Sequence, residues 1–404
     1  MKKLLSFLCL ILLAFVCVFA TGCGNKANQD NTKPVAKEDI KIGLICLHDE
    51  SSTYDKNFID SMKRALANLG ISEKQLEIVT GVPEGQECYD TAALLAKTCN
   101  IIFADSFGHE DFMIQAAKKF TNVNFSHATG TKAHTEKLDN YVNAFAAIYE
   151  GRYLAGIAAG MKLNEMIASG KITASQAKMG YVGAFPYAEV KSGYTSFYLG
   201  AKSVCPTVTM EVRFTSSWYD FDKEKAAAEA LINGGCVLIS QHADSYGAPE
   251  ACEKAGVPNV TYNGTTVSQC PNTYVVSSKI DWAPYYEYAI GQTLKGEKID
   301  VDYVGTIASG SVKLDALGTA AAPGTQAAID TAKAALQNGR LHVFDTNTFT
   351  VGGKKVTTYL ADIDDDGTFT PETEVIKDGY FHESEYRSAP AFDMDIDGIT
   401  LINE

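Results

Sequence analysis

From residue 41 onward, short apolar runs alternate with amphipathic segments, and this alternation constrains the fold more than any other feature of the chain. Alternating strands and helices are typical of α/β folds with parallel sheets. We expect strands at residues 42–47, 76–79, 101–104, 123–125, 179–183, 209–214, 237–240, 259–262 and 274–277. We expect helices at residues 55–69, 144–167, 224–232 and 282–294.

The long helical segment at residues 144–167 separates the first four predicted strands from the next set, which indicates two lobes. A chain of 404 residues is also too long for one ordinary core. Residues 341–404 contain short alternating runs and hairpin turns, which predict a β-rich extension of the second lobe. The lobes are expected at residues 40–146 and 278–301 for the first, and at residues 147–277 and 302–340 for the second.

The first residues have the layout of a secretory signal. Two lysines precede an apolar run at residues 4–20, and the sequence Ala-Thr-Gly-Cys that ends at Cys23 resembles the bacterial lipobox. We therefore expect a lipoprotein signal peptide at residues 1–22 and a diacylglycerol on Cys23. A permanent transmembrane anchor is the alternative, but the small residues before the cysteine favour the lipobox. Polar residues 23–39 predict a flexible tether that holds the body at the extracytoplasmic face of the cell membrane.

The formal net charge of −14 argues against nucleic acid as a partner, because an acidic body repels phosphate backbones. The chain has ten cysteines, of which Cys9 and Cys17 fall in the predicted signal. Seven more lie beyond Cys23, several of them in apolar strand-like runs and none in a C-x-x-C motif. Their disulfide state stays open.

Polar and aromatic residues gather directly after many of the predicted strands. Because ligands of open parallel sheets bind beyond the carboxyl ends of the strands, we expect a binding site there. Its candidate residues are Asp49, Ser52, Tyr54, Asp105, Ser106, Thr129, Gly130, Phe185, Trp218, Asp244, Asn263 and Asp281. Rings, hydroxyls and carboxylates together suit a flat polar ligand, which stacks on its faces and pairs at its edges. The alternative is that they are ordinary turn residues.

Two groupings of titratable residues suggest catalysis, His109-Glu110-Asp111 and His242-Ala243-Asp244-Ser245. The sequence contains no G-x-S-x-G elbow, H-E-x-x-H helix or Walker loop, which argues against an enzyme. Residues 362–367 copy the first half of an EF-hand loop, but Thr373 stands where a bidentate glutamate is needed. We expect no catalytic residue, no metal and no cofactor.

Five blocks of the sequence resemble the basic membrane protein family, whose members are substrate-binding lipoproteins of ABC transporters. Several of these bind purine nucleosides or free purines. The blocks are KIG at 41–43, YEGRYLAG at 149–156, GYVGAFP at 180–186, SWYD at 217–220 and QHADS at 241–245. The resemblance spans residues 40 to 340 and implies a type I periplasmic-binding-protein fold, in which three crossovers join two Rossmann-like lobes.

By the family pattern, Trp218 and an aromatic near Tyr54 or Phe185 would sandwich the purine base. This sequence departs from the pattern after the first strand, where Ser52 stands in place of an expected aromatic. Asp244 would accept from a base nitrogen, while an aspartate after one of the first strands (Asp49 or Asp105) would meet the base edge or the ribose hydroxyls.

Together these features predict a monomeric, lipid-anchored binding protein that closes two lobes on a purine nucleoside or nucleobase and delivers it to an ABC permease. Three alternatives stay open: a lipoprotein receptor that signals its ligand state to a sensor, a binding protein for another solute such as a sugar, and a surface hydrolase.

Overall fold

The computed structural model describes residues 31–363 and 372–402. The predicted signal peptide and Cys23 lie outside the described residues, as does most of the EF-hand-like loop. No described helix combines the length and the apolar character that a membrane span requires.

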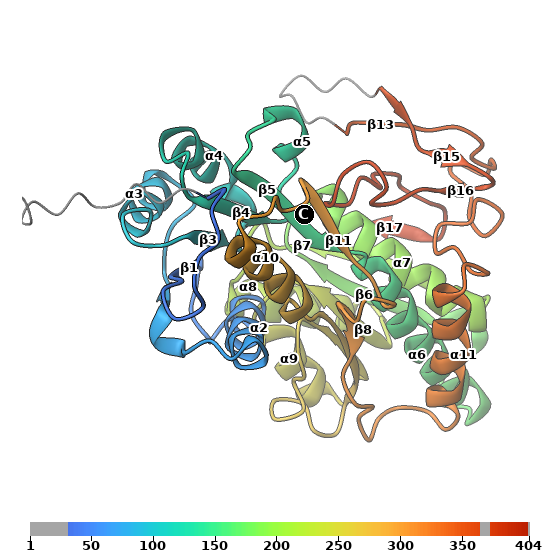
Figure 1. Ribbon diagram of the computed structural model, residues 1–404. Helices are drawn as coiled ribbons and strands as arrows, with labels where there is room; N and C mark the ends of the chain where they lie inside the picture. Colours follow the sequence, from blue (N-terminus) through green and yellow to red (C-terminus); the bar gives the residue numbers. More distant parts are fainter. Residues whose placement is uncertain (1–30, 364–371, 403–404) are drawn as a thin grey trace, which may run out of the picture. The chain divides into compact units, whose positions relative to one another are not determined.

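The first lobe is built on a parallel sheet of six strands, ordered β11-β5-β4-β3-β1-β2 (Figure 1). Its strands are β1 (Ile42–Ile45), β2 (Leu76–Val79), β3 (Ile101–Ala104), β4 (Asn124–Ala128), β5 (Tyr141–Ala146) and β11 (Asp302–Gly305). Its helices are α2 (Thr53–Leu69), α3 (Gln86–Leu95), α4 (Glu110–Lys119), α5 (Ala133–Glu136) and α10 (Ala283–Lys295), the last of which packs on α2.

The second lobe is built on a sheet of seven strands, ordered β12-β10-β9-β8-β6-β7-β17. Only the β10–β12 pair is antiparallel. Its strands are β6 (Lys178–Gly183), β7 (Thr209–Phe214), β8 (Leu238–His242), β9 (Asn259–Tyr262), β10 (Tyr274–Ile280), β12 (Val312–Leu314) and β17 (Ile399–Leu401). Its helices are α6 (Ile148–Ala168), α7 (Ala188–Val204), α8 (Phe221–Asn233), α9 (Gly247–Ala255) and α11 (Thr325–Gln337).

The chain passes between the two sheets three times, after β5, β10 and β11. This confirms the predicted α/β class with parallel-dominated sheets and three crossovers. Two details differ from the expectations. The helix expected from residue 144 begins at Ile148, because residues 141–146 form the fully buried strand β5, which pairs on both sides. Residues 302–305, expected in the second lobe, pair with β5 in the first sheet.

Helices α6 and α7 approach each other closely because glycines face the neighbouring backbone. A Cβ at Gly156 would lie 2.0 Å from the carbonyl oxygen of Phe197, and one at Gly200 would lie 2.0 Å from that of Tyr153. No side chain fits such a gap. The contact fixes helix α7, whose first turn carries Glu189 to the candidate site.

The described part of the C-terminal extension, residues 341–363 and 372–402, is β-rich, as predicted. Two short antiparallel pairs of strands precede the final strand: β13 (Leu360–Ala361) with β14 (Thr373–Glu374), and β15 (Ile376–Lys377) with β16 (Tyr380–Phe381). The extension has its own aromatic cluster, in which Phe344 stacks on Phe392 with ring centres 4.4 Å apart. Strand β17 then joins the second sheet beside β7.

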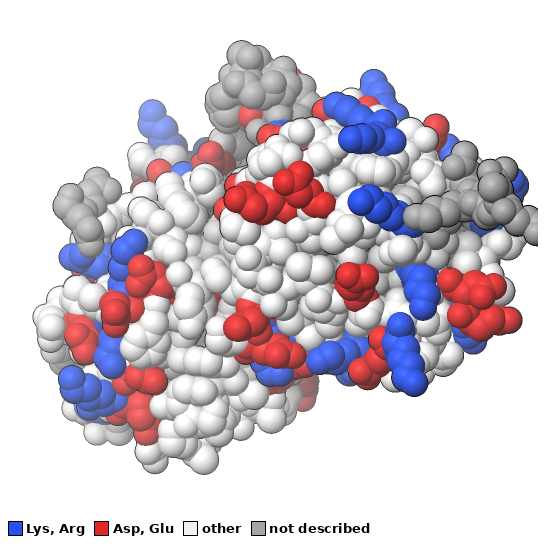
Figure 2. All heavy atoms as spheres, turned by 90° about the vertical axis from the view of Figure 1, so that its left-hand side faces the viewer, with Lys and Arg blue, Asp and Glu red and all other residues white. Residues whose placement is uncertain are grey.

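On the face drawn in Figure 2, acidic and basic side chains are interspersed, and the described residues form no continuous basic band there. This distribution agrees with the acidic net charge. The seven cysteines of the described residues are all buried and free.

Candidate ligand-binding site

A pocket, here called the inner pocket, lies between the carboxyl ends of strands from both sheets. Its lining consists of Leu47, His48, Tyr54, Asp55, Ser106, Phe107 and Thr129 from the first lobe, and Glu189, Trp218, His242, Asp244 and Tyr262 from the second. About 390 Å³ inside it is free of protein atoms, but only about 20 Å³ admits the centre of a water molecule. Since one water needs roughly 10–15 Å³ by this measure, the pocket is tightly closed.

The two lobes touch directly at this pocket. The backbone N–H and the hydroxyl of Thr53 both donate to the carbonyl oxygen of Asp244, each at 3.1 Å. The ring of Phe107 also stacks on that of Tyr187, with ring centres 5.3 Å apart. These contacts join the first lobe to the second, so the structure is a closed form.

Aromatic rings form the second lobe's side of the pocket mouth. Phe185 stacks on Tyr187 at 5.2 Å and meets Trp218 edge-on at 5.1 Å. Trp218 lines the pocket, while Phe185 lies outside the lining and contacts the ring of Trp218. Such an arrangement offers a ring face and edge to a flat ligand.

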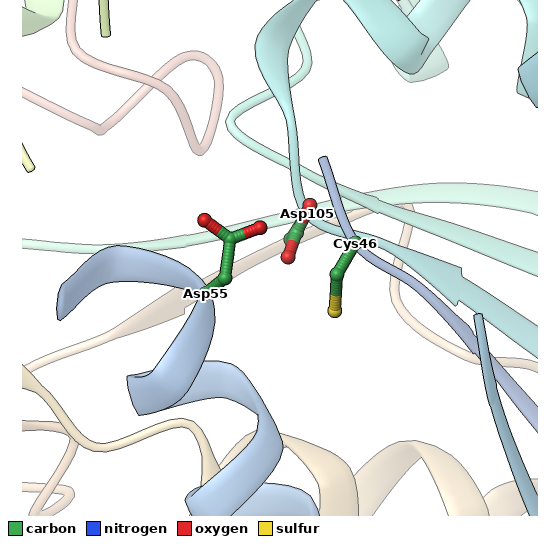
Figure 3. A group of neighbouring side chains, drawn as sticks. All are labelled: Cys46, Asp55 and Asp105. Carbon is green, nitrogen blue, oxygen red and sulfur yellow. The ribbon is translucent and has the colours of Figure 1, made fainter. Parts of the chain in front are cut away.

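Two carboxyl groups and a thiol from the first lobe meet beneath the pocket. Cys46, Asp55 and Asp105 are all buried, and their ligating atoms lie within 4.8 Å of one another. Figure 3 shows the carboxyl group of Asp55 directed toward Asp105. Burial, followed by the charge of Asp55, raises the pKa of Asp105 well above its usual range. Burial would also raise that of Asp55, but hydrogen bonds from His48 and Ser52 outweigh it and lower its pKa.

A metal ion fits this cluster poorly. Burial raises the pKa of the Cys46 thiol well above its ordinary value, whereas a metal would need the thiolate. Both oxygens of Asp55 already accept hydrogen bonds, from the His48 N–H at 2.8 Å and the Ser52 hydroxyl at 2.6 Å. The cluster is therefore better suited to hold a protonated Asp105 beside an ionised Asp55 than to hold a cation.

The second lobe contributes a similar group of acidic side chains. Burial, and then the charge of Glu224, raises the pKa of Asp244 well above its usual range. Asp244 can therefore retain a proton and donate as well as accept. Glu189 lies 3.5 Å from Nε2 of His242, whose pKa is lowered by burial.

A fully buried arginine underlies the second lobe's side of the pocket. The guanidinium of Arg152 lies 5.4 Å from the ring centre of Tyr262, a lining residue. It donates to the Ser240 hydroxyl at 2.8 Å, the Tyr181 hydroxyl at 3.1 Å and the Thr261 carbonyl at 3.2 Å. None of the described carboxylates forms an ion pair with it, so its charge is solvated by hydroxyls, carbonyls and rings.

Some of the predicted residues come together on the pocket lining, and others lie outside it. Those on the lining are Tyr54, Ser106, Thr129, Trp218 and Asp244. Those outside it are Asp49, Ser52, Asp105, Gly130, Phe185, Asn263 and Asp281. Ligand contact remains a prediction for all of them.

Several residues outside the lining have structural contacts of their own. The carboxylate of Asp281 pairs with Arg64 at 2.7 Å and Lys313 at 2.6 Å, and so ties helix α2 to strand β12. Ser52 is the N-cap of α2, and its side chain accepts from the backbone of Asp55.

Lining residues outside the candidate set fall into two kinds. Leu47, His48, Phe107, His242 and Tyr262 lie within or just after the ends of strands, as the strand-end rule requires. Asp55 and Glu189 instead come from the first turns of the helices that follow. Both are acidic residues in the first turn of a helix that follows a strand-end loop. This pattern in the sequence can identify them, although the N-terminus of any helix favours a negative charge.

Residues 42–315 match the family described as "ABC transporter substrate-binding protein PnrA-like". A purine-binding protein of Brucella abortus is 33% identical over 255 residues, which cover 62% of this chain and 68% of that protein. A putative ABC transporter glucose-binding protein of Haloferax volcanii is 36% identical over 187 residues, which cover 46% of this chain but only 44% of that one.

The fold is also that of solved solute-binding proteins. One from Aeropyrum pernix superimposes with a TM-score of 0.63 at 14% identity, covering 76% of this chain and 93% of the other. Its likeness shows the fold and nothing more specific. The family match spans most of the two-lobed body, from β1 to just beyond β12. The chain thus belongs to the PnrA-like family of ABC transporter substrate-binding proteins, the family that its sequence blocks resemble.

Proposed function

We propose that this substrate-binding protein captures a purine nucleobase or nucleoside in the inner pocket and delivers it unaltered to an ABC permease. A lipid on Cys23 would hold the monomeric protein at the outer face of the cell membrane. The observation that carries the proposal is the pocket itself, in which a Trp218 ring and the buried carboxyl of Asp244 face residues of the other lobe. The Brucella relative named as a purine-binding protein supports the same ligand class.

Capture would follow from lobe closure. Tyr54 and Phe107 belong to the first lobe, and Trp218 and Asp244 to the second, so a ligand touches both sets only in the closed form. Asp244 would pair with a base nitrogen, because a buried carboxyl that can donate and accept matches the edge of a purine. An analogue without the partner group leaves this carboxyl unsatisfied, which gives selectivity.

The proposal also excludes catalysis. Burial lowers the pKa of His242 and favours its neutral imidazole, and none of the described hydrogen bonds joins this ring to a hydroxyl that could act as a nucleophile. We therefore expect the purified protein to release its ligand unchanged. Chromatography of a nucleoside after prolonged incubation tests this, and accumulation of free base, lost in His242→Ala, would establish a hydrolase instead.

Titration calorimetry of the purified protein tests the ligand class. We expect adenine, guanine or their nucleosides to bind, and Asp244→Ala to weaken binding by roughly 10-fold or more, as loss of a hydrogen bond in a buried site does. Glucose is the competing ligand, because the Haloferax relative is named as a glucose-binding protein. Binding of glucose without any purine would replace the purine proposal with a sugar transporter.

A further inference from the structure

A second and roomier cavity, here called the outer chamber, lies beside the inner pocket. By the same measure it offers about 290 Å³, against about 20 Å³ for the inner pocket. One wall comes from the first lobe and one from the start of helix α7. The third comes from the C-terminal extension, through Tyr359, Arg387 and Asp393 among others.

The two cavities are neighbours with shared walls. Phe107, Thr129 and Glu189 line both of them. A ligand whose flat part occupies the inner pocket can therefore project a substituent past these residues into the outer chamber. The linings favour this order, because the rings and the buried carboxyl of the inner pocket suit a flat base and the larger chamber suits a bulkier group.

The chemistry of the outer chamber suits a group with several hydroxyls. Arg387 is 8% exposed and donates to the carbonyl oxygens of Pro390 at 2.9 Å, Ala389 at 3.3 Å and Ile363 at 3.4 Å. A guanidinium has five N–H donors, so two remain for a ligand. No described carboxylate forms an ion pair with this arginine.

Acceptors and a ring complete the chamber. Glu189 and Asp393 supply carboxylates that accept from hydroxyls, and Tyr359 supplies a half-buried ring on which the C–H face of a sugar can pack. A phosphate would meet these carboxylates at close range, which disfavours an anionic group. The mixture of donors, acceptors and a ring matches a neutral glycosyl group.

The extension is held in place by both lobes. Lys191 on α7 pairs with Asp393 at 2.7 Å. On the other side, the N–H and the hydroxyl of Ser388 both donate to Asp302 of strand β11, each at 2.8 Å. The wall is thus anchored to α7 of the second lobe and β11 of the first. Residues 341–402 lie outside the family match at 42–315, so this wall is an addition to the shared fold.

We propose that the outer chamber is a subsite for the glycosyl group of the ligand, and that the C-terminal extension makes the protein select nucleosides over free nucleobases. This inference rests on the proposed function, because it places the purine base in the inner pocket. It assigns residues 341–402 a role in specificity.

Titration calorimetry with adenosine and adenine, and with guanosine and guanine, tests the inference. The wild-type protein is expected to bind a nucleoside more tightly than its base. Arg387→Gln is expected to weaken nucleoside binding roughly 10-fold while base binding changes less than twofold, as expected when charge-assisted hydrogen bonds to one group are lost. Arg340→Gln, at an exposed position directly before the extension, is the matched control and should change neither.

Arg387 also holds carbonyls of the extension, so a second variant is needed. Tyr359→Leu removes the ring on which the sugar packs and leaves the contacts of Arg387 in place, so it should weaken nucleoside binding alone. Equal loss of base and nucleoside affinity, or no loss in either variant, overturns the inference. Tighter binding of the base than of the nucleoside by the wild-type protein would also overturn the inference, but it would leave the proposed function intact. Failure of every purine to bind the wild-type protein would remove both.

Discussion

The ring of Phe107, just after strand β3, stacks on the ring of Tyr187, just before helix α7, at an interplanar angle of 27°. One residue belongs to each lobe, and Phe107 borders both cavities. Separating the lobes must break this contact. The pair of rings must therefore separate before the lobes can open and release a ligand.

Removing the ring of Phe107 is expected to speed ligand release. An aromatic pair contributes about 0.5–1.5 kcal/mol beyond its buried area, so Phe107→Ala should raise the dissociation rate of the bound purine roughly 2- to 12-fold. Stopped-flow fluorescence measures this rate. Phe107→Trp retains a ring and should release slowly, and equal rates in the alanine variant and the wild type would show that the stack does not hold the closed state.

Replacing Glu224 should stabilise the protein at high pH. Burial raises the pKa of this glutamate to about 7, although it accepts from the backbone of Ser245 and Asp220. Its folded pKa lies above its unfolded value, so its contribution is complete below about pH 4.5 and is lost as the pH rises through 7. Glu224→Gln removes this loss and keeps an accepting oxygen.

The expected gain for Glu224→Gln is small at pH 5 and approaches about 3 kcal/mol at pH 8, since each pKa unit corresponds to about 1.4 kcal/mol. Urea unfolding at both pH values measures it. Glu229→Gln, more exposed on the same helix, is the matched control. A gain that is the same at both pH values would mean that Glu224 does not titrate in this range.

Replacing the buried Arg152 should cost much of the protein's stability. Arg152→Met leaves the Thr261 carbonyl and the Ser240 hydroxyl without their partner, and a buried group left unsatisfied costs about 1–3 kcal/mol. We expect a loss of at least about 3 kcal/mol in denaturant unfolding. Arg340→Met is the exposed control and should stay within about 0.5 kcal/mol of the wild type. A small loss at both sites would show that Arg152 is not structurally required.

Releasing the extension from helix α7 should expose it to proteases. Lys191 is largely buried and pairs with Asp393 at 2.7 Å and Asp395 at 3.3 Å. Lys191→Met leaves both carboxylates unpaired, so cleavage within residues 341–402 should become several times faster than in the wild type. Limited proteolysis followed by mass spectrometry measures the rate. Lys56→Met, which breaks the exposed pair with Asp60, should leave it unchanged.

The sequence predicts most of the sheet because period and composition are local properties. The strands at 76–79, 101–104, 209–214 and 259–262 coincide with β2, β3, β7 and β9. Strand β5 was missed because its residues are buried on both faces and, apart from Asn143, apolar, so they merge in the sequence with the apolar helix α6. Pairing with β4 and β11, which no local pattern contains, decides that it is a strand.

The candidate site is predictable only in part, for a related reason. The rule that ligands bind at strand ends locates Trp218 and Asp244 on the pocket lining. It does not locate the outer chamber, because Tyr359 and Arg387 reach the cleft from a segment that ends in the second sheet. Likewise, Asp281 follows strand β10 as the rule asks, but Arg64 and Lys313 engage its carboxylate. Only the three-dimensional structure shows that other side chains already engage a carboxylate that follows a strand.

The pairing of β17 with β7 has a consequence for any shortened form of this protein. Without Ile399–Leu401, the backbone N–H and C=O groups along one side of β7 would have no neighbour. An uncovered edge strand is a template on which strands of other chains add, and it promotes aggregation. The last strand therefore protects the protein against self-association, and recombinant forms that end before residue 399 are expected to precipitate even where both lobes fold.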